Sequence, residues 1–226
     1  LYILSFPSCN EIKEENINQN TLQRKSPNER QVDRFADIQI LRYEIKDVDS
    51  LSLSQKQLVY FLSQAWLSGR DIIYDQNNAY NLEIRKCLEG IIKGYKGDKE
   101  SDQWYLFMTY VKQVWFANGI HHHYGMEKFS PKFTQEYFAH LLEATGETIS
   151  IDAIATIFNK DIDSKRKVKD PSVDMIVASA NNFYGKGVTL SMVENFYKAK
   201  IDTLDPYPIE YLSLIHISEP TRPTRI

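Results

Sequence analysis

Three successive runs of apolar residues, between positions 52 and 119, constrain the fold of this chain most. In each run the apolar side chains recur every three or four residues, the spacing that places them on one face of an α-helix. Ser52 and Gln55 form a capping box before the first run, and Gly69, Gly97 and the pair Asn118-Gly119 end the three helices in turn. The three apolar faces comprise Leu58, Phe61, Leu62, Ala65 and Trp66; Ile84, Cys87, Leu88, Ile91, Ile92 and Tyr95; and Trp104, Phe107, Met108, Val111, Val114 and Trp115.

Three further helices are expected after these. One runs from Thr134 to Thr145, a second begins after the capping residue Ser150, and the last begins after Thr189. Irregular segments are expected at 119–132 and 161–187.

One strand is expected before the helices. Residues 35–45 alternate between apolar and polar side chains from Ile38 onward, with one slip at Leu41. Alternation with period two among branched and aromatic residues is typical of a β-strand. The sequence therefore predicts an α+β fold that is mostly helical, with a minor strand component.

Composition and charge argue against several classes of protein. Of the 226 residues, 42% are apolar and 25% are charged, which is ordinary for a globular protein. The net charge of −3, without a basic stripe, gives no sign of nucleic-acid binding. No apolar run reaches the roughly 18 residues that a membrane-spanning helix requires. The two cysteines suit neither a disulfide framework nor a zinc ribbon, and Cys87 is expected to be a buried thiol.

The N-terminal residues resemble the end of a bacterial lipoprotein signal peptide. Residues 1–6 are mostly apolar, and Pro7 and Ser8 lead to Cys9, the expected lipidation site. A lipid on Cys9 would be the only membrane attachment and would place the protein at the bacterial cell envelope. A frayed terminus with a free thiol, and a cytoplasmic location, are the alternatives. Residues 10–31 are expected to be a disordered linker, because few of their side chains are apolar.

The C-terminal segment 212–226 has no amphipathic period and contains two prolines among basic residues. It resembles the translated read-through of a sequencing adapter and is therefore set aside when the fold is predicted. A native disordered tail is the alternative. On the adapter interpretation, the natural protein continues beyond Tyr211 with other residues.

The segment 119–132 contains three adjacent histidines and is the first candidate site. In an extended chain His121 and His123 share a face and His122 points away, so the three cannot jointly bind one metal ion. No metal site is therefore predicted here. A solvated loop is one alternative. We favour a binding loop, because His, Tyr, Lys and Gly are concentrated between two helices.

The segment 179–189 is the second candidate, with two asparagines and two glycines before a helix. Its Gly185-Lys186-Gly187 is too short for a phosphate-binding loop, and a turn leading into the helix is the alternative. The 226 residues contain no His-Glu-x-x-His motif or close variant and no Gly-x-Ser-x-Gly elbow. No catalytic residue is therefore predicted in this chain.

Five motifs in residues 32–211 resemble the N-terminal part of dipeptidyl peptidase III, most closely the branch found in Bacteroides-like organisms. The motif that carries most of the resemblance extends from Val114 to Phe129 and includes Asn118-Gly119-Ile120-His121-His122-His123-Tyr124-Gly125 and Lys128. The other four are Arg34 to Tyr43, Gly69-Arg70-Asp71-Ile72, Tyr80-Asn81-Leu82-x-Ile84-Arg85, and Ser179 to Thr189.

The resemblance implies a two-lobed zinc exopeptidase that removes dipeptides from the N-terminus of short peptides. One lobe has a small β-barrel core, to which the predicted strand would belong, and a helical lobe holds zinc on a His-Glu-x-x-x-His helix with a distal Glu. In the family zinc polarises the scissile carbonyl and activates water, and the motif Glu is the general base. The peptide lies extended along a strand edge. The resemblance implies that the substrate cleft is lined by Asn118, Gly119, His121, His122, His123, Tyr124, Gly125 and Lys128.

Because the zinc motif is not in this chain, we expect a fragment that is inactive as given and binds no zinc, which only the full-length protein would hold. Its partners would be short peptide substrates. The alternative is a non-catalytic envelope lipoprotein that binds peptides or a partner protein through residues 119–132. A helical interaction domain without a ligand is the third interpretation.

Overall fold

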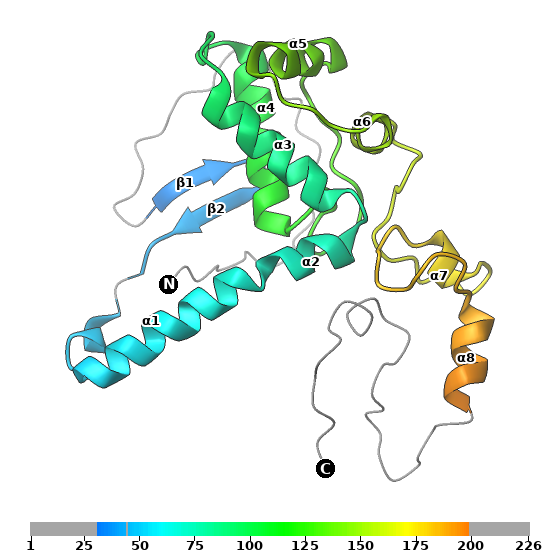
Figure 1. Ribbon diagram of the computed structural model, residues 1–226, viewed down its shortest axis with the longest axis horizontal. Helices are drawn as coiled ribbons and strands as arrows, with labels where there is room; N and C mark the ends of the chain where they lie inside the picture. The colour runs from blue at the N-terminus through cyan, green and yellow to red at the C-terminus, as the bar shows by residue number, and fades with distance from the viewer. Residues whose placement is uncertain (1–30, 44, 199–226) are drawn as a thin grey trace, which may run out of the picture. The chain divides into compact units, whose positions relative to one another are not determined.

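The computed structural model describes residues 31–43 and 45–198, and Figure 1 traces its helices and strands. The predictions for Cys9, for residues 1–9 and 10–30, and for residues 199–226 lie outside the described residues. The fold is mostly helical with one small two-stranded sheet, which confirms the α+β class. The chain divides into two compact units, residues 1–61 and 62–226.

The first unit contains an antiparallel β-hairpin. Strand β1 (Gln31–Phe35) pairs with β2 (Ile38–Leu41), and Ala36 adopts a positive φ of 47° in the two-residue turn. Phe35 and Ile38 face each other in the register and are both buried. The predicted strand was placed at residues 35–45, but Phe35 ends the first strand and the second ends at Leu41. The linker was expected to include Gln31, which instead begins β1, because backbone pairing with β2 orders it.

A short 3-10 helix η1 (Lys46–Val48) leads into α1 (Leu53–Ser68). The predicted capping box is confirmed: the Ser52 N–H donates to Gln55 Oε1 at 2.9 Å, and the Gln55 N–H donates to Ser52 Oγ at 3.3 Å. The helix is confirmed, but its apolar face is not covered: no residue of α1 is buried in the described chain. Phe61 and Trp66 are 65% and 67% exposed.

The second unit is built from seven helices within the described ranges. These are α2 (Arg70–Asn77), α3 (Asn81–Gly94), α4 (Asp102–Ala117), α5 (Gln135–Thr145), α6 (Ile151–Phe158), α7 (Met175–Ala178) and α8 (Leu190–Lys198). Helices α3 and α4 lie side by side, and α5 packs on α3 (Figure 1). The predicted cap Ser150 is confirmed, since its side chain accepts from Ala153 N. Thr134, where the fourth helix was expected to begin, is the cap of α5 and accepts from Tyr137 N.

One hydrophobic core joins α3, α4, α5 and α6. The predicted faces of α3 and α4 are buried, including Ile84, Leu88, Phe107 and Val114, whereas Trp115 is 38% exposed. Cys87 is buried as expected, and burial raises the pKa of its thiol to about 12, so the thiol stays protonated and inert. No helix in the described ranges has both the length and the apolarity needed to cross a membrane.

Candidate functional site

The three histidines lie in a tight loop directly after α4, which we call the His loop (residues 119–129). The loop folds back on itself: the His122 N–H donates to Glu127 O at 2.7 Å, and the Phe129 N–H donates to Ile120 O at 2.8 Å. His121 and Lys128 form an antiparallel bridge. These backbone bonds give the loop the geometry of a short hairpin.

A second segment, residues 164–169, lies beside the His loop, and we call it the basic segment because it reads Ser-Lys-Arg-Lys-Val-Lys. The Lys128 N–H donates to Ser164 O, and the Arg166 N–H donates to Met126 O, both at 2.9 Å. On its other side the Ala180 N–H donates to Lys165 O at 3.0 Å. Segments 120–122, 126–129, 164–166 and 180–181 therefore form one hydrogen-bonded array.

Asparagines of the turn between α2 and α3 attach this array to the helical core. Asn77 Nδ2 donates to Asn118 O at 2.9 Å. Asn78, which is 1% exposed, donates to Asp163 Oδ2 at 2.6 Å and to Ala180 O at 3.1 Å. Sequence reasoning missed this role, although a run of three asparagines within five residues is a turn signal that could have indicated it.

Asn81 binds the start of the His loop. It is fully buried, its Nδ2 donates to Tyr74 O, and its Oδ1 accepts from Ile120 N, both at 3.1 Å. Gly119 has a φ of 144°, and a Cβ there would collide with the Asn81 side-chain amide. Asn118 precedes it in the left-handed conformation that ends α4. Asn118 and Gly119, both predicted as cleft residues, therefore have a structural role: they set the direction in which the loop leaves α4.

His121 is a buried internal support. Its side chain is 1% exposed, and Nε2 lies 2.7 Å from Asp163 O. Because a carbonyl oxygen can only accept, Nε2 carries the proton. Burial lowers the pKa of His121, the bond to Asp163 opposes this shift, and the charges of Arg166 and Lys128 add to it.

The other residues at the tip are more exposed. His122 Nδ1 accepts from the Tyr124 and Gly125 N–H groups at 3.2 and 3.0 Å, and its ring stacks on His123 at 4.4 Å. The His123 ring also meets Phe116 edge-on at 4.8 Å. Tyr124 is 64% exposed. Tyr124 and the adjoining histidine rings therefore present an aromatic surface at the loop tip.

Lys128 caps the end of α6. Its ammonium donates to Thr156 O at 2.8 Å, to Asn159 O at 2.6 Å and to Ile162 O. A cation at a helix C-terminus satisfies carbonyls that have no partner in the helix. We predicted Lys128 as a cleft residue, and a substrate contact through its ammonium would have to break one of these bonds.

Arg166 is a site residue that sequence reasoning missed. Its guanidinium is half-buried, and it donates to Met126 Sδ at 2.9 Å and to His123 O at 3.3 Å. Burial is the cause that lowers the pKa of Arg166, and none of the ion pairs among the described residues includes it. A guanidinium stays charged in proteins, so here a cation is desolvated without a carboxylate to balance it.

The residues present do not fit a zinc ion. His121 Nε2 and His122 Nδ1 both hold hydrogen bonds within the array, and these bonds set the orientation of the two rings. Among the described residues no group of three or more His, Cys, Asp or Glu side chains is placed to hold a metal. A zinc-binding role is therefore not assigned to these histidines.

The second candidate segment serves to connect elements. Asn181 Nδ2 donates to Arg166 O at 3.0 Å, and the Asn182 N–H donates to Gln76 O at 2.8 Å. Thr189 caps α8 by accepting from Met192 N at 3.3 Å. The segment therefore attaches the basic segment to α2 and leads into α8.

Comparison with known proteins assigns no family to the chain. No protein-family model and no curated protein matches it. The resemblance to dipeptidyl peptidase III thus depends on the quoted motifs, and what it implies about activity is a proposal.

Proposed function

We propose that the His loop and the basic segment form one wall of a peptide-binding cleft in a zinc-dependent exopeptidase that removes dipeptides from the N-terminus of short peptides. The two-lobed metallopeptidase architecture is part of this proposal. The 226 residues by themselves do not catalyse the reaction, because they contain no His-Glu-x-x-x-His motif. The zinc chemistry belongs to the full-length protein.

The observation that carries the proposal is the unbalanced Arg166 guanidinium beside the exposed loop tip. A half-buried cation without a carboxylate is costly for the folded chain, and a ligand carbonyl or carboxylate would offset that cost. Tyr124 adds an exposed aromatic ring on the same loop. Arginine and tyrosine are the residue types most often found at the centres of binding surfaces.

Contacts between the family-like motifs give the proposal its second support. The motifs at 69–72 and 80–85 meet through the Asp71–Arg85 ion pair, at 2.7 Å. The motif at 80–85 meets the His loop through Asn81, which binds Ile120 N. The motif at 179–189 meets the basic segment through Asn181. Residues that carry the resemblance thus contact one another and hold the loop in place.

The chain's own residues would bind and orient the substrate. Arg166 would donate a hydrogen bond to a peptide carbonyl or carboxylate, and the tip of the His loop would contact a side chain. The α2–α3 turn keeps the loop rigid, so little ordering entropy would be lost on binding. We assign no proton transfer to this chain.

The test compares the 226-residue chain with a version extended by the downstream reading frame of its source DNA. A chromogenic dipeptide amide is the substrate, with and without a chelator. The extended version should release dipeptides in a chelator-sensitive manner, and the 226-residue chain should release none. Chelator-sensitive release by the 226-residue chain would overturn the proposal.

A matched pair of variants in the extended version tests the wall itself. Arg166→Gln should raise KM about tenfold or more, because a charge-assisted hydrogen bond is lost. Lys93→Gln removes an exposed positive charge on α3, outside the His loop and the basic segment, and should leave KM unchanged. Equal effects of the two variants would show that general charge, and no specific contact, sets KM.

The alternative is a non-catalytic envelope lipoprotein that binds peptides or a partner protein through the same surface. The engagement of His121 and His122 within the array favours binding over metal chemistry at this loop. An extended version that binds peptides but never cleaves them would support this alternative.

A further inference from the structure

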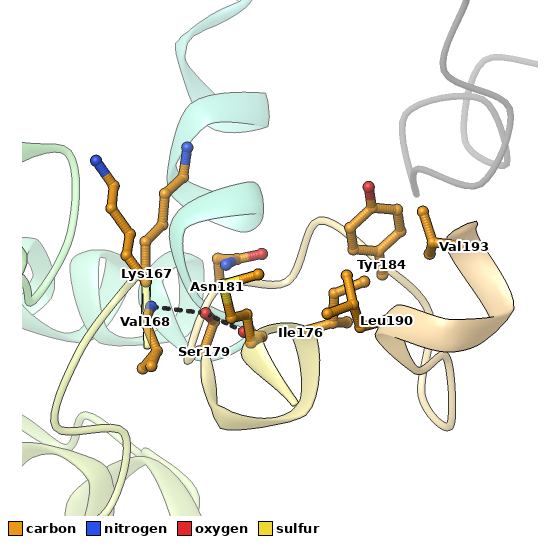
Figure 2. Close-up of a pocket in the computed structure, with 10 residues that line it drawn as sticks. Lys167, Val168, Ile176, Ser179, Asn181, Tyr184, Leu190 and Val193 are labelled. Atoms are coloured by element: carbon orange, nitrogen blue, oxygen red, sulfur yellow. Dashed lines mark hydrogen bonds between the residues drawn. The ribbon is translucent and has the colours of Figure 1, made fainter. Parts of the chain in front are cut away.

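An open pocket of about 240 Å³ lies between the basic segment and helices α7 and α8. Figure 2 shows Lys167 on one side of it and Leu190 and Val193 on the other. Lys169 and Ile176 also line it. The lining of the pocket therefore combines two lysine side chains with apolar side chains.

Ser179 and Asn181, two further polar residues of the lining, already hold hydrogen bonds within the chain. Ser179 Oγ accepts from Val168 N at 2.9 Å and donates to Met175 O at 2.6 Å. The Asn181 amide donates to Arg166 O and accepts from Phe183 N. The two lysines therefore offer a ligand donors that Ser179 and Asn181 do not.

No acidic residue of the described chain forms an ion pair with Lys167 or Lys169. The nearest acidic residue in sequence to the pocket's helices is Asp174. Its carboxylate accepts from the N–H groups of Ile176, Val177 and Leu190, at 3.0, 3.1 and 3.0 Å. Asp174 therefore joins the first turns of α7 and α8. Asp170, which follows Lys169 in sequence, accepts from the Ser172 N–H and hydroxyl at 2.9 and 2.6 Å. Neither carboxylate forms an ion pair with the two lysines.

We propose that this pocket binds the C-terminal residue of a peptide. The carboxylate would meet the ammonium groups of Lys167 and Lys169, and an apolar side chain would pack on Ile176, Leu190 and Val193. A carboxylate next to an apolar group matches both halves of the pocket. The peptide identity of the ligand rests on the proposed function.

The position of the pocket suits a short peptide. Lys169 is three residues beyond Arg166, so the two lie at most about 10 Å apart along the chain. A peptide that contacts the His loop would reach the pocket within a few residues. The pocket would thus favour peptides whose C-terminus falls at this distance.

The experiment measures binding to the 226-residue chain by calorimetry, so that no hydrolysis is needed. The probes are an N-acetylated pentapeptide ending in leucine with a free carboxylate, the same peptide as a C-terminal amide, and 4-methylpentanoate. The acid peptide should bind at least about tenfold more tightly than the amide, the ratio expected for a lost charge-assisted bond. Equal binding of acid and amide overturns the proposal, as does an absence of saturable binding.

Variants locate the site. Lys167→Gln with Lys169→Gln, and separately Val193→Asp, should each reduce acid-peptide affinity to that of the amide. Lys96→Gln is the control, because Lys96 is exposed and belongs neither to the basic segment nor to the His loop. A larger loss in the control than in the double variant contradicts the assignment.

The third probe separates peptide from free acid. If 4-methylpentanoate binds as tightly as the acid peptide, the pocket is a site for small carboxylic acids and the peptide assignment fails. If the acid peptide binds but the extended version shows no peptidase activity, the proposed function is contradicted and this inference is not. If the extended version has peptidase activity but no peptide binds at this pocket, this inference is contradicted and the proposed function is not.

Discussion

Helices α1 and α4 have the same length of 16 residues, yet they differ completely in burial. In α4 six residues are buried, and in α1 none is. Both are rich in aromatic and aliphatic side chains, and Lys56 is the single charged residue of α1. The difference teaches that apolar spacing predicts a helical face, whereas burial requires a partner surface. For α4 that partner is the core formed with α3, α5 and α6.

The largest effect should come from truncating a buried aromatic ring in α4. Phe107 is fully buried and lies 5.4 Å from the Trp104 ring and 5.5 Å from the Phe133 ring. Phe107→Ala should lower the free energy of unfolding by about 3–5 kcal/mol, because it leaves a cavity. Urea unfolding followed by circular dichroism measures this.

Phe61→Ala in α1 is the matched control, because Phe61 is 65% exposed. It should change the free energy of unfolding by no more than about 0.5 kcal/mol. Equal losses of stability in the two variants would contradict the difference in burial between α1 and α4.

A smaller loss of stability is expected at Asn81, where the helical core contacts the His loop. Asn81→Ala removes two hydrogen bonds and leaves Ile120 N and Tyr74 O without that partner. We expect a loss of about 2–3 kcal/mol in the free energy of unfolding, because buried polar groups lose their partners. Gln113→Ala, on α4, is the control. A similar loss in its free energy of unfolding would show that the hydrogen bonds of Asn81 have no special importance.

The pH dependence of stability should reveal the buried His121. Since burial lowers its folded-state pKa below 6.5, the unfolded chain takes up the proton first as the pH falls. This contribution to stability is fully present above pH 6.5 and is lost as the pH falls from there through the lowered pKa. Urea unfolding between pH 7.5 and 5 should show the loss.

Variants assign that pH dependence to one side chain. His121→Gln should flatten the stability profile in this range. His140→Gln removes a solvent-exposed imidazole and should leave the profile as in the parent. A profile unchanged in His121→Gln would contradict the buried, neutral state of this histidine.

Charge changes on α1 are expected to have a small effect on stability. Phe61→Glu with Trp66→Lys should alter the free energy of unfolding by about 1 kcal/mol at most, since both side chains are exposed. The same change should reduce self-association, because exposed apolar side chains promote it. Light scattering after size-exclusion chromatography compares the variant with the parent. A monodisperse parent would contradict the expectation that α1 causes association.

Local signals in the sequence determined much of the helical framework. The helix at 102–117 with its stop at Asn118 and the cap Ser150 were predicted correctly, and the helix at 81–94 was predicted with its end three residues too late, at Gly97. Periodicity, capping side chains and glycine act over one or two turns of chain, so a single sequence carries them. The sequence also indicated the segment 119–132, which contains the His loop, as a candidate site.

Tertiary structure decided which of these residues support the fold and which face outward. His121 binds Asp163, 42 residues away, and Lys128 caps a helix that ends about 30 residues later. Asn78 binds Ala180 across 102 residues. Such partners are set by packing over long sequence separations, which no local pattern encodes. The same reason explains why α1, with an apolar pattern like that of α4, is left without a buried residue.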